Sequence, residues 1–427
     1  MTQAQALKAL KLGLNIFLTG AAGSGKTFVL NKYIDFLKKK NIGVAITAST
    51  GIAATHMNGI TIHAWSGMGV KEELNDNDLT KIGRNSRVRN RMRSVKVLII
   101  DEVSMLHAYQ LDMVDVICRR FLNKHRPFGG LQIVLCGDFF QLPPIQKDKT
   151  KEIRFVFSAQ CWQESDINVC YLSEQHRQKN DELVKVLNSI RNGKAEKEHS
   201  AQLTTRLNAE LIGQVNPTRL FSHNNDVDRV NNIEFTKLSG AAMLYEMRSN
   251  GIEPLIENLK AGCLAPESLL LKCGTQVMFV KNNFDLGYVN GTTGVVIGFE
   301  EETRMPIVVT SSGKRLVARP ESWSIEEDET ILASVRQVPL RLAWAITIHK
   351  SQGMSLDMVE IDLSKAFEYG MGYVALSRVR TMQGLRLLGI NDLALEVNPD
   401  ILERDTELQE QSRQFIKKLK LKSKQNE

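Results

Sequence analysis

Residues 15–19 of the chain read NIFLT, and residues 20–27 that follow them read GAAGSGKT. The apolar run is typical of a short buried strand. Residues 27–40 have the periodicity of a helix, with one apolar face made of Val29, Leu30, Tyr33, Ile34 and Leu37. A loop of the form GxxxxGK[ST] between a strand and a helix binds phosphate groups through its backbone N–H groups and the helix N-terminus. The stretch therefore predicts a nucleotide site.

Two side chains of this loop have specific roles in such a site. Lys26 is placed to reach the β- and γ-phosphate oxygens of the nucleotide, and the hydroxyl of Thr27 is placed to ligate Mg²⁺. The predicted nucleotide contacts of the loop are Gly20, Gly23, Ser24, Gly25, Lys26 and Thr27. Loops of this form occur in kinases, GTPases, transporters and motors, so the loop alone leaves open what the nucleotide is used for.

Three further apolar runs predict the sheet that carries the loop. They are VAITAS (44–49), VKVLIIDE (95–102) and LQIVLCGD (131–138). Continuous apolar strands separated by helical patterns indicate a parallel sheet that is buried on both faces. Ligands of such α/β sheets bind beyond the carboxyl ends of the strands, where all these motifs lie.

Polar residues at these strand ends predict hydrolysis. Asp101 is assigned to the Mg²⁺ shell, and Glu102 to the general base that polarises the attacking water. Gln141, in GDFFQLPP, is assigned to the γ-phosphate or that water. The alternatives are a solvated turn for the two acids, and for Gln141 a role in satisfying backbone groups ahead of Pro143 and Pro144.

The second half of the chain predicts another α/β unit that is interrupted by β structure. TRLFSH (218–223) is a candidate strand before a helical pattern, and short β runs fill residues 274–318 around an Asn290-Gly291 hairpin signal. The expected boundaries are 1–168 for the first α/β domain with an insertion at about 67–93, 169–273 and 336–400 for the second, 274–335 for a small inserted β-barrel, and 401–427 for a basic tail.

Composition favours a polyanionic partner. The 427 residues are 43% hydrophobic and 24% charged, with a formal net charge of +7 and a pI of about 9.0. Residues 81–96 carry seven Lys/Arg and no acid. In an extended segment Arg87, Arg89, Arg91 and Arg93 would share one face and contact phosphates; the alternative is a solvated loop. Lys417–Lys424 is expected to be a frayed, solubilising end.

Other features indicate a soluble intracellular chain. No apolar run approaches the roughly 18 residues that cross a bilayer, and the N-terminus lacks a signal-peptide pattern. The cysteines show no zinc-binding spacing and are expected to be free, mostly buried thiols; they are Cys118, Cys136, Cys161, Cys170, Cys263 and Cys273.

Together, the motifs resemble those of superfamily 1 helicases, and among these the PIF-family DNA helicases and their RecD-like relatives. The segments that carry the resemblance are GAAGSGKT, TASTGIAA (47–54), TIHAWSG (61–67), LIIDEVSML (98–106), RPFGGLQIVLCGDFFQLPP (126–144), EQHRQ (174–178), AITIHKSQGMSLD (345–357) and YVALSRVR (373–380). The resemblance spans about residues 1–390, and PFGG running into GDFFQLPP is especially characteristic.

The resemblance implies two RecA-like domains with ATP between them, an inserted β-barrel, and 5′-to-3′ movement on single-stranded DNA. It assigns Gln3 to the adenine base, and Arg177 and Arg378 to charge on the transferring phosphate. Thr50, Gly51 and His63 match DNA-backbone contacts on the first domain, and Thr347, His349 and Lys350 match those on the second. Gln352 and Gly353 match the segment that links the second strip to the nucleotide.

The chain departs from the family pattern at two positions. Met371 stands where the family usually has Gln, which puts a contact near the last motif in doubt, and His223 replaces a common Thr. Trp65 is an aromatic near the expected DNA path, with a buried core position as its alternative. The chain begins almost at Gln3 and ends soon after the core, so no accessory domain is expected.

The expected partners are single-stranded DNA and tailed or forked duplexes, with residues 67–93 as the candidate strand-separating element and a monomer as the working form. The sequence does not distinguish forks, G-quadruplexes and RNA–DNA hybrids as preferred substrates. Two other functions stay open: an RNA-directed superfamily 1 helicase, and an ATP-gated remodeller that does not unwind. The family's roles in DNA repair, recombination and telomere maintenance are implied only by the resemblance.

Overall fold

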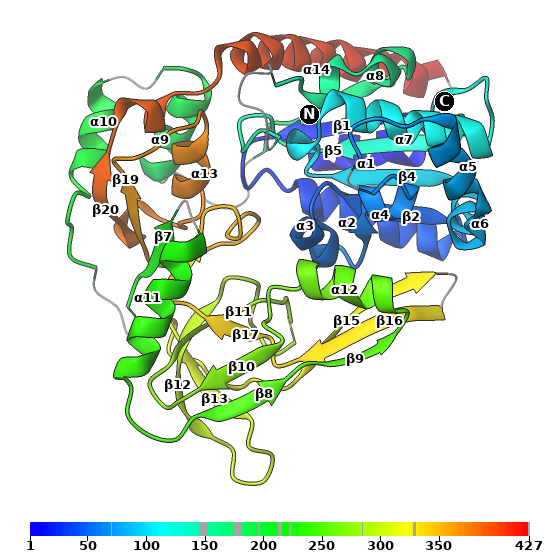
Figure 1. Cartoon of the computed structure of the whole chain (residues 1–427). Helices are drawn as coiled ribbons and strands as arrows, with labels where there is room; N and C mark the ends of the chain where they lie inside the picture. Colours follow the sequence, from blue (N-terminus) through cyan, green and yellow to red (C-terminus); the bar gives the residue numbers. More distant parts are fainter. Residues whose placement is uncertain are drawn as a thin grey trace. The chain divides into compact units, whose positions relative to one another are not determined.

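The protein divides into two compact units (Figure 1). Unit 1 comprises Met1–Lys179 and Pro399–Glu427, and unit 2 comprises Asn180–Asn398. This computed structural model describes residues 1–69, 71–144, 153–174, 182–194, 197–211, 216–221, 224–283, 285–327 and 330–425. No helix within those ranges is long and apolar enough to cross a membrane.

Unit 1 is built on a six-stranded parallel sheet with the order β3-β2-β4-β5-β1-β6. Its strands are β1 (Ile16–Gly20), β2 (Val44–Ala48), β3 (Ile60–Thr61), β4 (Val97–Asp101), β5 (Gln132–Cys136) and β6 (Asn168–Leu172). Its α-helices are α1 (Gln3–Lys11), α2 (Lys26–Lys39), α3 (Gly51–His56), α4 (Ile62–Ser66), α5 (Asp76–Arg84), α6 (Ser86–Ser94), α7 (Ala108–Phe121), α8 (Gln160–Glu164) and α14 (Pro399–Gln425). Short 3₁₀ turns are η1 (Val103–Met105), η2 (Pro127–Gly130) and η3 (Val156–Ser158).

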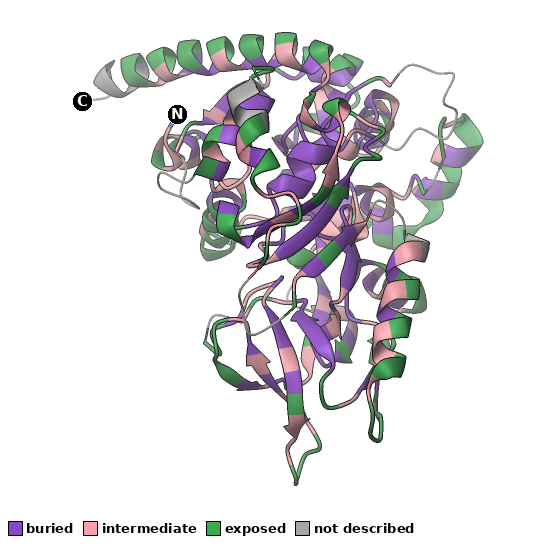
Figure 2. Ribbon diagram, turned by 90° about the vertical axis from the view of Figure 1, so that its left-hand side faces the viewer, coloured by how far each residue is buried: buried purple, intermediate pink, exposed green. Residues whose placement is uncertain are grey.

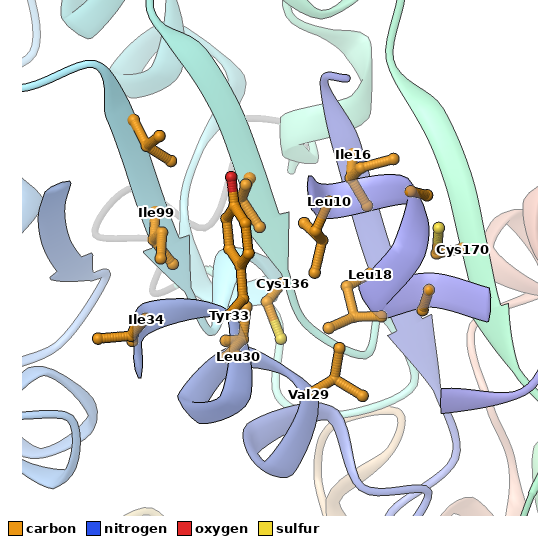
Figure 3. Packing of buried hydrophobic residues seen from close by; sticks show 14 of the residues in the cluster. Leu10, Ile16, Leu18, Val29, Leu30, Tyr33, Ile34, Ile99, Cys136 and Cys170 are labelled. Carbon is orange, nitrogen blue, oxygen red and sulfur yellow. The ribbon is translucent and has the colours of Figure 1, made fainter. Parts of the chain in front are cut away.

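The apolar face predicted for residues 27–40 is confirmed. All five predicted side chains of α2 are buried, and they pack in one cluster with residues of β1, β4 and β5. Figure 3 shows Val29, Leu30 and Tyr33 among the sheet residues Leu18 and Ile99. Burial of one such aliphatic side chain is worth about 1.5–3 kcal/mol. The helix that follows the phosphate loop is thereby fixed to the strand that precedes it.

Unit 1 extends beyond the boundary expected at residue 168. Strand β6 pairs in parallel with β1, from Ile16 opposite Asn168 to Gly20 opposite Leu172. The apolar residues of β6 identify a strand, but nothing local to them says which sheet they join. The sheet of the first domain therefore includes a segment that the sequence analysis assigned to the second.

The C-terminal residues differ from the expected basic tail. They form α14, a helix of 27 residues that packs against β6. Ile401, Leu408 and Phe415 are buried and recur every seven residues, so they share one face of the helix. Figure 2 shows mostly exposed residues along the outer side of this helix. The helix was not predicted from the sequence because its apolar residues are few among many lysines.

The basic stretch at 81–96 is helical and not extended, so the expected shared face of four arginines is wrong. Asn85 caps α6 by accepting hydrogen bonds from the backbone N–H groups of Arg87 and Val88. Val88 and Met92 lie one helical turn apart and are buried. The arginines occupy the remaining faces, where alternate residues lie about 200° apart.

Unit 2 contains a four-stranded parallel sheet with the order β18-β7-β19-β20. Its strands are β7 (Thr218–Phe221), β18 (Ala345–Thr347), β19 (Val359–Leu363) and β20 (Leu385–Ile390). The helices of the unit are α9 (Glu182–Arg191), α10 (Lys197–Thr204), α11 (Asn224–Lys237), α12 (Glu253–Gly262), α13 (Met371–Leu376), η4 (Met382–Gly384) and η5 (Asp392–Leu395).

The inserted β structure of unit 2 begins earlier than the expected residue 274. Its strands are β8 (Met243–Glu246), β9 (Arg248–Gly251), β10 (Ser268–Leu271), β11 (Gln276–Phe279), β12 (Thr293–Phe299), β13 (Pro306–Thr310), β14 (Arg315–Val317), β15 (Glu321–Glu327), β16 (Thr330–Gln337) and β17 (Leu340–Leu342).

Among the described residues these strands form separate sheets of five (β14-β13-β12-β11-β17), three (β15-β16-β9) and two (β10-β8) strands and not one closed barrel. Strands β11 and β12 are antiparallel as expected, although Asn290 and Gly291 lie within a longer connection. Strand β9 reads RSNG and is exposed throughout, so no apolar pattern could have marked it.

Candidate nucleotide and nucleic-acid sites

The phosphate loop runs from the end of β1 into α2. Gly20, Gly23 and Gly25 have φ angles of +147°, +83° and +87°, which favour glycine. A Cβ at Gly20 would lie 2.7 Å from the carbonyl oxygen of Leu172. The Nζ of Lys26 donates to the carbonyl oxygen of Gly20 at 2.8 Å. The loop therefore has the backbone conformation that the motif predicts, with its lysine turned inward.

Gln3 lies beside this loop. Its Nε2 donates to the carbonyl oxygen of Ser24 at 3.1 Å, and its backbone N–H donates to Oε2 of Glu174 at 2.9 Å. A Cβ at Gly25 would lie 2.0 Å from Gln3 Nε2. Thr2 begins α1 with a capping box that includes Gln5. Gln3 thus lies against the loop, where the resemblance places an adenine-reading residue.

Asp101 is the last residue of β4, and its carboxylate is hydrogen-bonded to a residue of the adjacent strand β5. Its Oδ1 accepts the backbone N–H of Glu102 at 2.9 Å, and its carboxylate is hydrogen-bonded to the thiol of Cys136. Burial raises the pKa of Asp101, against the opposing effect of these bonds and of Lys26. Burial likewise raises the pKa of Cys136, so this thiol keeps its proton and donates. All six cysteines are free, and only Cys273 is exposed.

Glu102 has a left-handed backbone, with φ 51° and ψ 44°. Such a conformation costs a non-glycine residue on the order of 1–3 kcal/mol and persists where the surroundings enforce it. The hydroxyl of Ser49 donates to the carbonyl oxygen of Glu102 at 2.7 Å, and the Ser49 N–H donates to that of Asp101 at 3.1 Å. The end of β2 thus holds both acids in their turn.

Gln141 lies at the same edge of the sheet, because β5 pairs in parallel with β4. Its side chain is buried, and its backbone N–H donates to the carbonyl oxygen of Asp138 at 3.0 Å. The loop, the two acids and Gln141 therefore all follow the carboxyl ends of neighbouring strands in one sheet. This is the arrangement that the sequence predicts.

The PFGG segment has a structural role that the sequence analysis did not identify. Phe128, Gly129 and Gly130 have positive φ angles of 48°, 64° and 87°. The backbone N–H of Phe128 donates to Asp115 of α7, and a Cβ at Gly129 would lie 2.6 Å from Cβ of Leu122. The segment is a tight corner packed on α7 that sets the entry of β5.

The residues of the nucleotide site fit a bound nucleotide and Mg²⁺. The glycine positions leave room for backbone alone, and Ser24 Oγ is buried without a hydrogen-bond partner among the described residues. Thr27 lies in the first turn of α2 and supplies a hydroxyl oxygen, while Asp101 supplies carboxylate oxygens. Oxygen donors of these types are the ligands that Mg²⁺ prefers.

The DNA contacts expected on unit 1 lie where β2 and β3 run into helices. Thr50 caps α3 through its hydroxyl, and Gly51 is the first residue of that helix. His63 is half-buried in α4, with its Nε2 3.1 Å from Nε2 of Gln110. Burial lowers the pKa of His63, which keeps the ring neutral at neutral pH. Trp65 is buried, which favours the interpretation as a core residue over a contact with DNA.

The corresponding strip on unit 2 follows β18. The hydroxyl of Thr347 accepts the backbone N–H of Lys350 at 3.2 Å, and the N–H of Ser351 donates to the Thr347 carbonyl oxygen at 3.0 Å. His349 lies between them in this turn. Gln352 is buried, and Gly353 has a φ of +78°.

Arg341 of β17 is a candidate that sequence reasoning missed. Burial lowers the pKa of Lys350, and the nearby positive charge of Arg341 lowers it further, with Asp228 acting in the opposite direction. Burial also lowers the pKa of Arg341, and its Nε has no hydrogen-bond partner among the described residues. The available signal was a lone cation inside the apolar run PLRLAW.

Arg378 is buried within unit 2. Its Nε donates to the carbonyl oxygen of Val374 at 2.9 Å and its NH1 to that of Ser351 at 3.3 Å. This second bond ties it to the turn that carries Gln352. Met371, which stands where the family usually has Gln, is buried at the start of α13, so its side chain is part of the core. Arg177 and His223 lie outside the described residues.

Two comparisons identify relatives of this chain. Residues 2–201 match the family of PIF1-like helicases, and residues 254–299 match the DNA helicase Pif1 2B domain. The chain is 44% identical to the ATP-dependent DNA helicase Pif1 of a Psychrobacter species, over 93% of this chain and 69% of that protein. It spans 60–63% of the length of its eukaryotic relatives.

Solved structures agree with this assignment. Pif1 helicase from Candida albicans is 36% identical, with a TM-score of 0.75 and coverage of 95% of this chain and 98% of that one. Bacteroides Pif1 in complex with ADP-AlF3 and single-stranded DNA is 27% identical, with a TM-score of 0.63 and coverage of 95% and 97%. With the phosphate loop, strand-end acids and two RecA-like sheets in place, the chain belongs to the Pif1 family of DNA helicases.

Proposed function

We propose that the protein is an ATP-dependent DNA helicase that moves 5′-to-3′ along single-stranded DNA and unwinds duplexes ahead of it. The observation that carries this proposal is the shared edge of the unit 1 sheet. The phosphate loop, Asp101, Glu102 and Gln141 meet there, and Thr50 and His63 follow neighbouring strands of the same sheet. The Psychrobacter relative is an ATP-dependent DNA helicase, and the Bacteroides Pif1 helicase is seen in complex with ADP-AlF3 and single-stranded DNA.

In this proposal the chain's own residues divide the hydrolysis between them. The loop N–H groups and Lys26 hold the phosphates of ATP, and Gln3 contacts the base. Thr27 and Asp101 hold Mg²⁺, which neutralises charge on the β- and γ-phosphate oxygens when bound. Glu102 polarises the attacking water, and Gln141 orients it. Arg177 and Arg378 stabilise the charge that develops on the transferred phosphate.

The proposed grip on DNA uses phosphate contacts on each unit. Thr50, Gly51 and His63 act on unit 1, and Thr347, His349, Lys350 and Arg341 act on unit 2. Two neighbouring cations, Lys350 and Arg341, suit a phosphodiester backbone, and such contacts are independent of sequence and sensitive to salt. ATP binding and hydrolysis alternate the grip of the two units, which moves the protein along the strand. A monomer suffices for this mechanism, and its site of action is intracellular, where ATP and DNA occur.

ATP turnover with and without single-stranded DNA tests this proposal. Wild-type protein with ATP and Mg²⁺ is expected to hydrolyse ATP faster when single-stranded DNA is added. Lys26→Ala should lower turnover on the order of 10²–10³-fold, since it removes a preorganised cation from the phosphates. A rate of ATP hydrolysis that does not change when single-stranded DNA is added would refute the proposal. Stronger stimulation by a matched RNA strand would favour the RNA-directed alternative.

A further inference from the structure

The C-terminal helix α14, which belongs to unit 1, is hydrogen-bonded to Tyr171 of strand β6. The backbone N–H of Tyr171, in β6, donates to Oγ of Ser412 at 3.1 Å. The phenol of Tyr171 donates to the carboxylate of Asp405, whose oxygens lie 3.0 and 3.1 Å away. Asp405 and Ser412 are both buried, at 8% and 2% exposure, although they are polar. The apolar face of α14 alone would not require these two bonds, so they fix α14 in one register on β6.

The same strand end holds the first residues of the chain. The Met1 nitrogen donates to the carbonyl oxygen of Tyr171 at 2.7 Å, and the Ser173 N–H donates to the carbonyl oxygen of Met1 at 3.2 Å. Two residues on, Gln3 is bound to Glu174 through its backbone N–H. Tyr171 is therefore bonded to α14 on one side and to the start of the chain on the other.

A continuous set of contacts thus joins α14 to the adenine side of the nucleotide site. It runs from Asp405 and Ser412 to Tyr171, then to Met1, and ends at Gln3, whose amide lies on the phosphate loop at Ser24. Every member belongs to unit 1. Phe415 of α14 also packs in the cluster that contains Ala6, Ala9 and Leu10 of α1, so the two helices share one core.

We propose that α14 is a positioning element for Gln3, acting through Tyr171, and that it sets the affinity and base preference of the enzyme for ATP. This inference rests on the proposed ATPase function and on Gln3 as the base-reading residue. A glutamine amide both donates and accepts, which matches the amino donor and ring-nitrogen acceptor on one edge of adenine. Such a pair of bonds is selective only if the amide is held in place.

The test is a double-mutant cycle on the full chain. Tyr171→Phe removes only the hydroxyl that bonds Asp405, and Gln3→Ala removes the amide. Glu410→Gln is the matched control, because it alters an exposed polar residue on the outer face of α14. KM and kcat are measured for ATP and for GTP, whose base has the acceptor O6 in place of the amino donor of adenine, at saturating single-stranded DNA, together with the Tm of each variant.

Tyr171→Phe is expected to raise KM for ATP roughly threefold to tenfold, with kcat within about twofold, and to reduce the preference for ATP over GTP. Gln3→Ala should reduce the same preference in the wild type and change it little further in Tyr171→Phe. Glu410→Gln should match the wild type.

Additive effects of Tyr171→Phe and Gln3→Ala would overturn the proposal, as would a lower Tm with base preference unchanged. So would an unchanged base preference in Gln3→Ala alone. These outcomes leave the proposed function standing if DNA still stimulates ATP turnover. Loss of that stimulation in the wild type would refute the proposed function separately.

Discussion

Replacement of Arg341 by glutamine tests the proposed grip on DNA with a predictable magnitude. Arg341 is mostly withdrawn from water, its Nε lacks a partner among the described residues, and Lys350 adds a second positive charge beside it. Asp228 is the carboxylate that acts on both cations. A phosphate that contacts this pair would gain a charge-assisted hydrogen bond, worth about 1.5 kcal/mol, or roughly tenfold in Kd.

Salt dependence gives a second magnitude for the same variant. Each phosphate neutralised on a single strand contributes about −0.7 to the slope of log K against log salt. Loss of one contact should therefore make the slope shallower by about 0.7. As salt rises from 50 to 200 mM, the ratio of the Kd of Arg341→Gln to the Kd of the wild type should therefore fall by about 2.6-fold.

The assay is fluorescence anisotropy of a labelled single strand over that salt range. Arg336→Gln is the matched control, because it removes the same charge from the same unit at an exposed position of β16. Equal Kd values and equal slopes for the two variants would refute the assignment of Arg341 to the DNA strip. ATP turnover without DNA should be unchanged in both.

Three other outcomes are expected. Glu102→Gln should lower kcat for ATP by on the order of 10²-fold and leave single-strand binding intact, as measured by turnover and anisotropy; normal turnover would exclude Glu102 as the base. Because the folded-state pKa of His63 is lowered, its contribution to stability is present above the unfolded pKa of about 6.5 and is lost as pH falls below it. Urea unfolding of His63→Gln should show a weaker loss of stability at acid pH than wild type, and His125→Gln, at an exposed position, should not. Gly129→Ala should lower the free energy of unfolding by about 1–3 kcal/mol, because its φ is +64° and its Cβ would meet Leu122; an unchanged Tm would contradict this.

Local spacing explains why the nucleotide half of the site is predictable. The phosphate loop, the acids of β4 and the segment that carries Gln141 are each contiguous in sequence and lie at strand ends. In a parallel sheet those ends share one edge, so pattern alone brings Lys26, Asp101 and Gln141 together. The buried face of α2 follows from its periodicity for the same reason.

Features that depend on distant partners could not be predicted in this way. Strand β6 joins β1 across some 150 residues of chain, and α14 packs on β6 from the other end of the sequence. The arginines at 87–93 suggested an extended face, but capping by Asn85 and the buried pair Val88 and Met92 favour a helix.

Two functional assignments show the same limit. Arg341 becomes a candidate DNA contact only because it lies close to Lys350, nine residues later in sequence. The thiol of Cys136 has a role only because it is hydrogen-bonded to Asp101 on the adjacent strand. Neither pair has a spacing that a motif records. Arg177 is assigned by the resemblance alone, since it lies outside the described residues.

Unwinding of tailed duplexes tests the proposed function most directly. A duplex with a 5′ single-stranded tail and one with a 3′ tail are compared with ATP and Mg²⁺, with Lys26→Ala as the inactive control. The proposal predicts unwinding of the 5′-tailed duplex alone, lost in Lys26→Ala. Unwinding of neither duplex, with DNA-stimulated ATP turnover intact, would contradict the helicase assignment and identify a translocase or remodeller that does not separate strands.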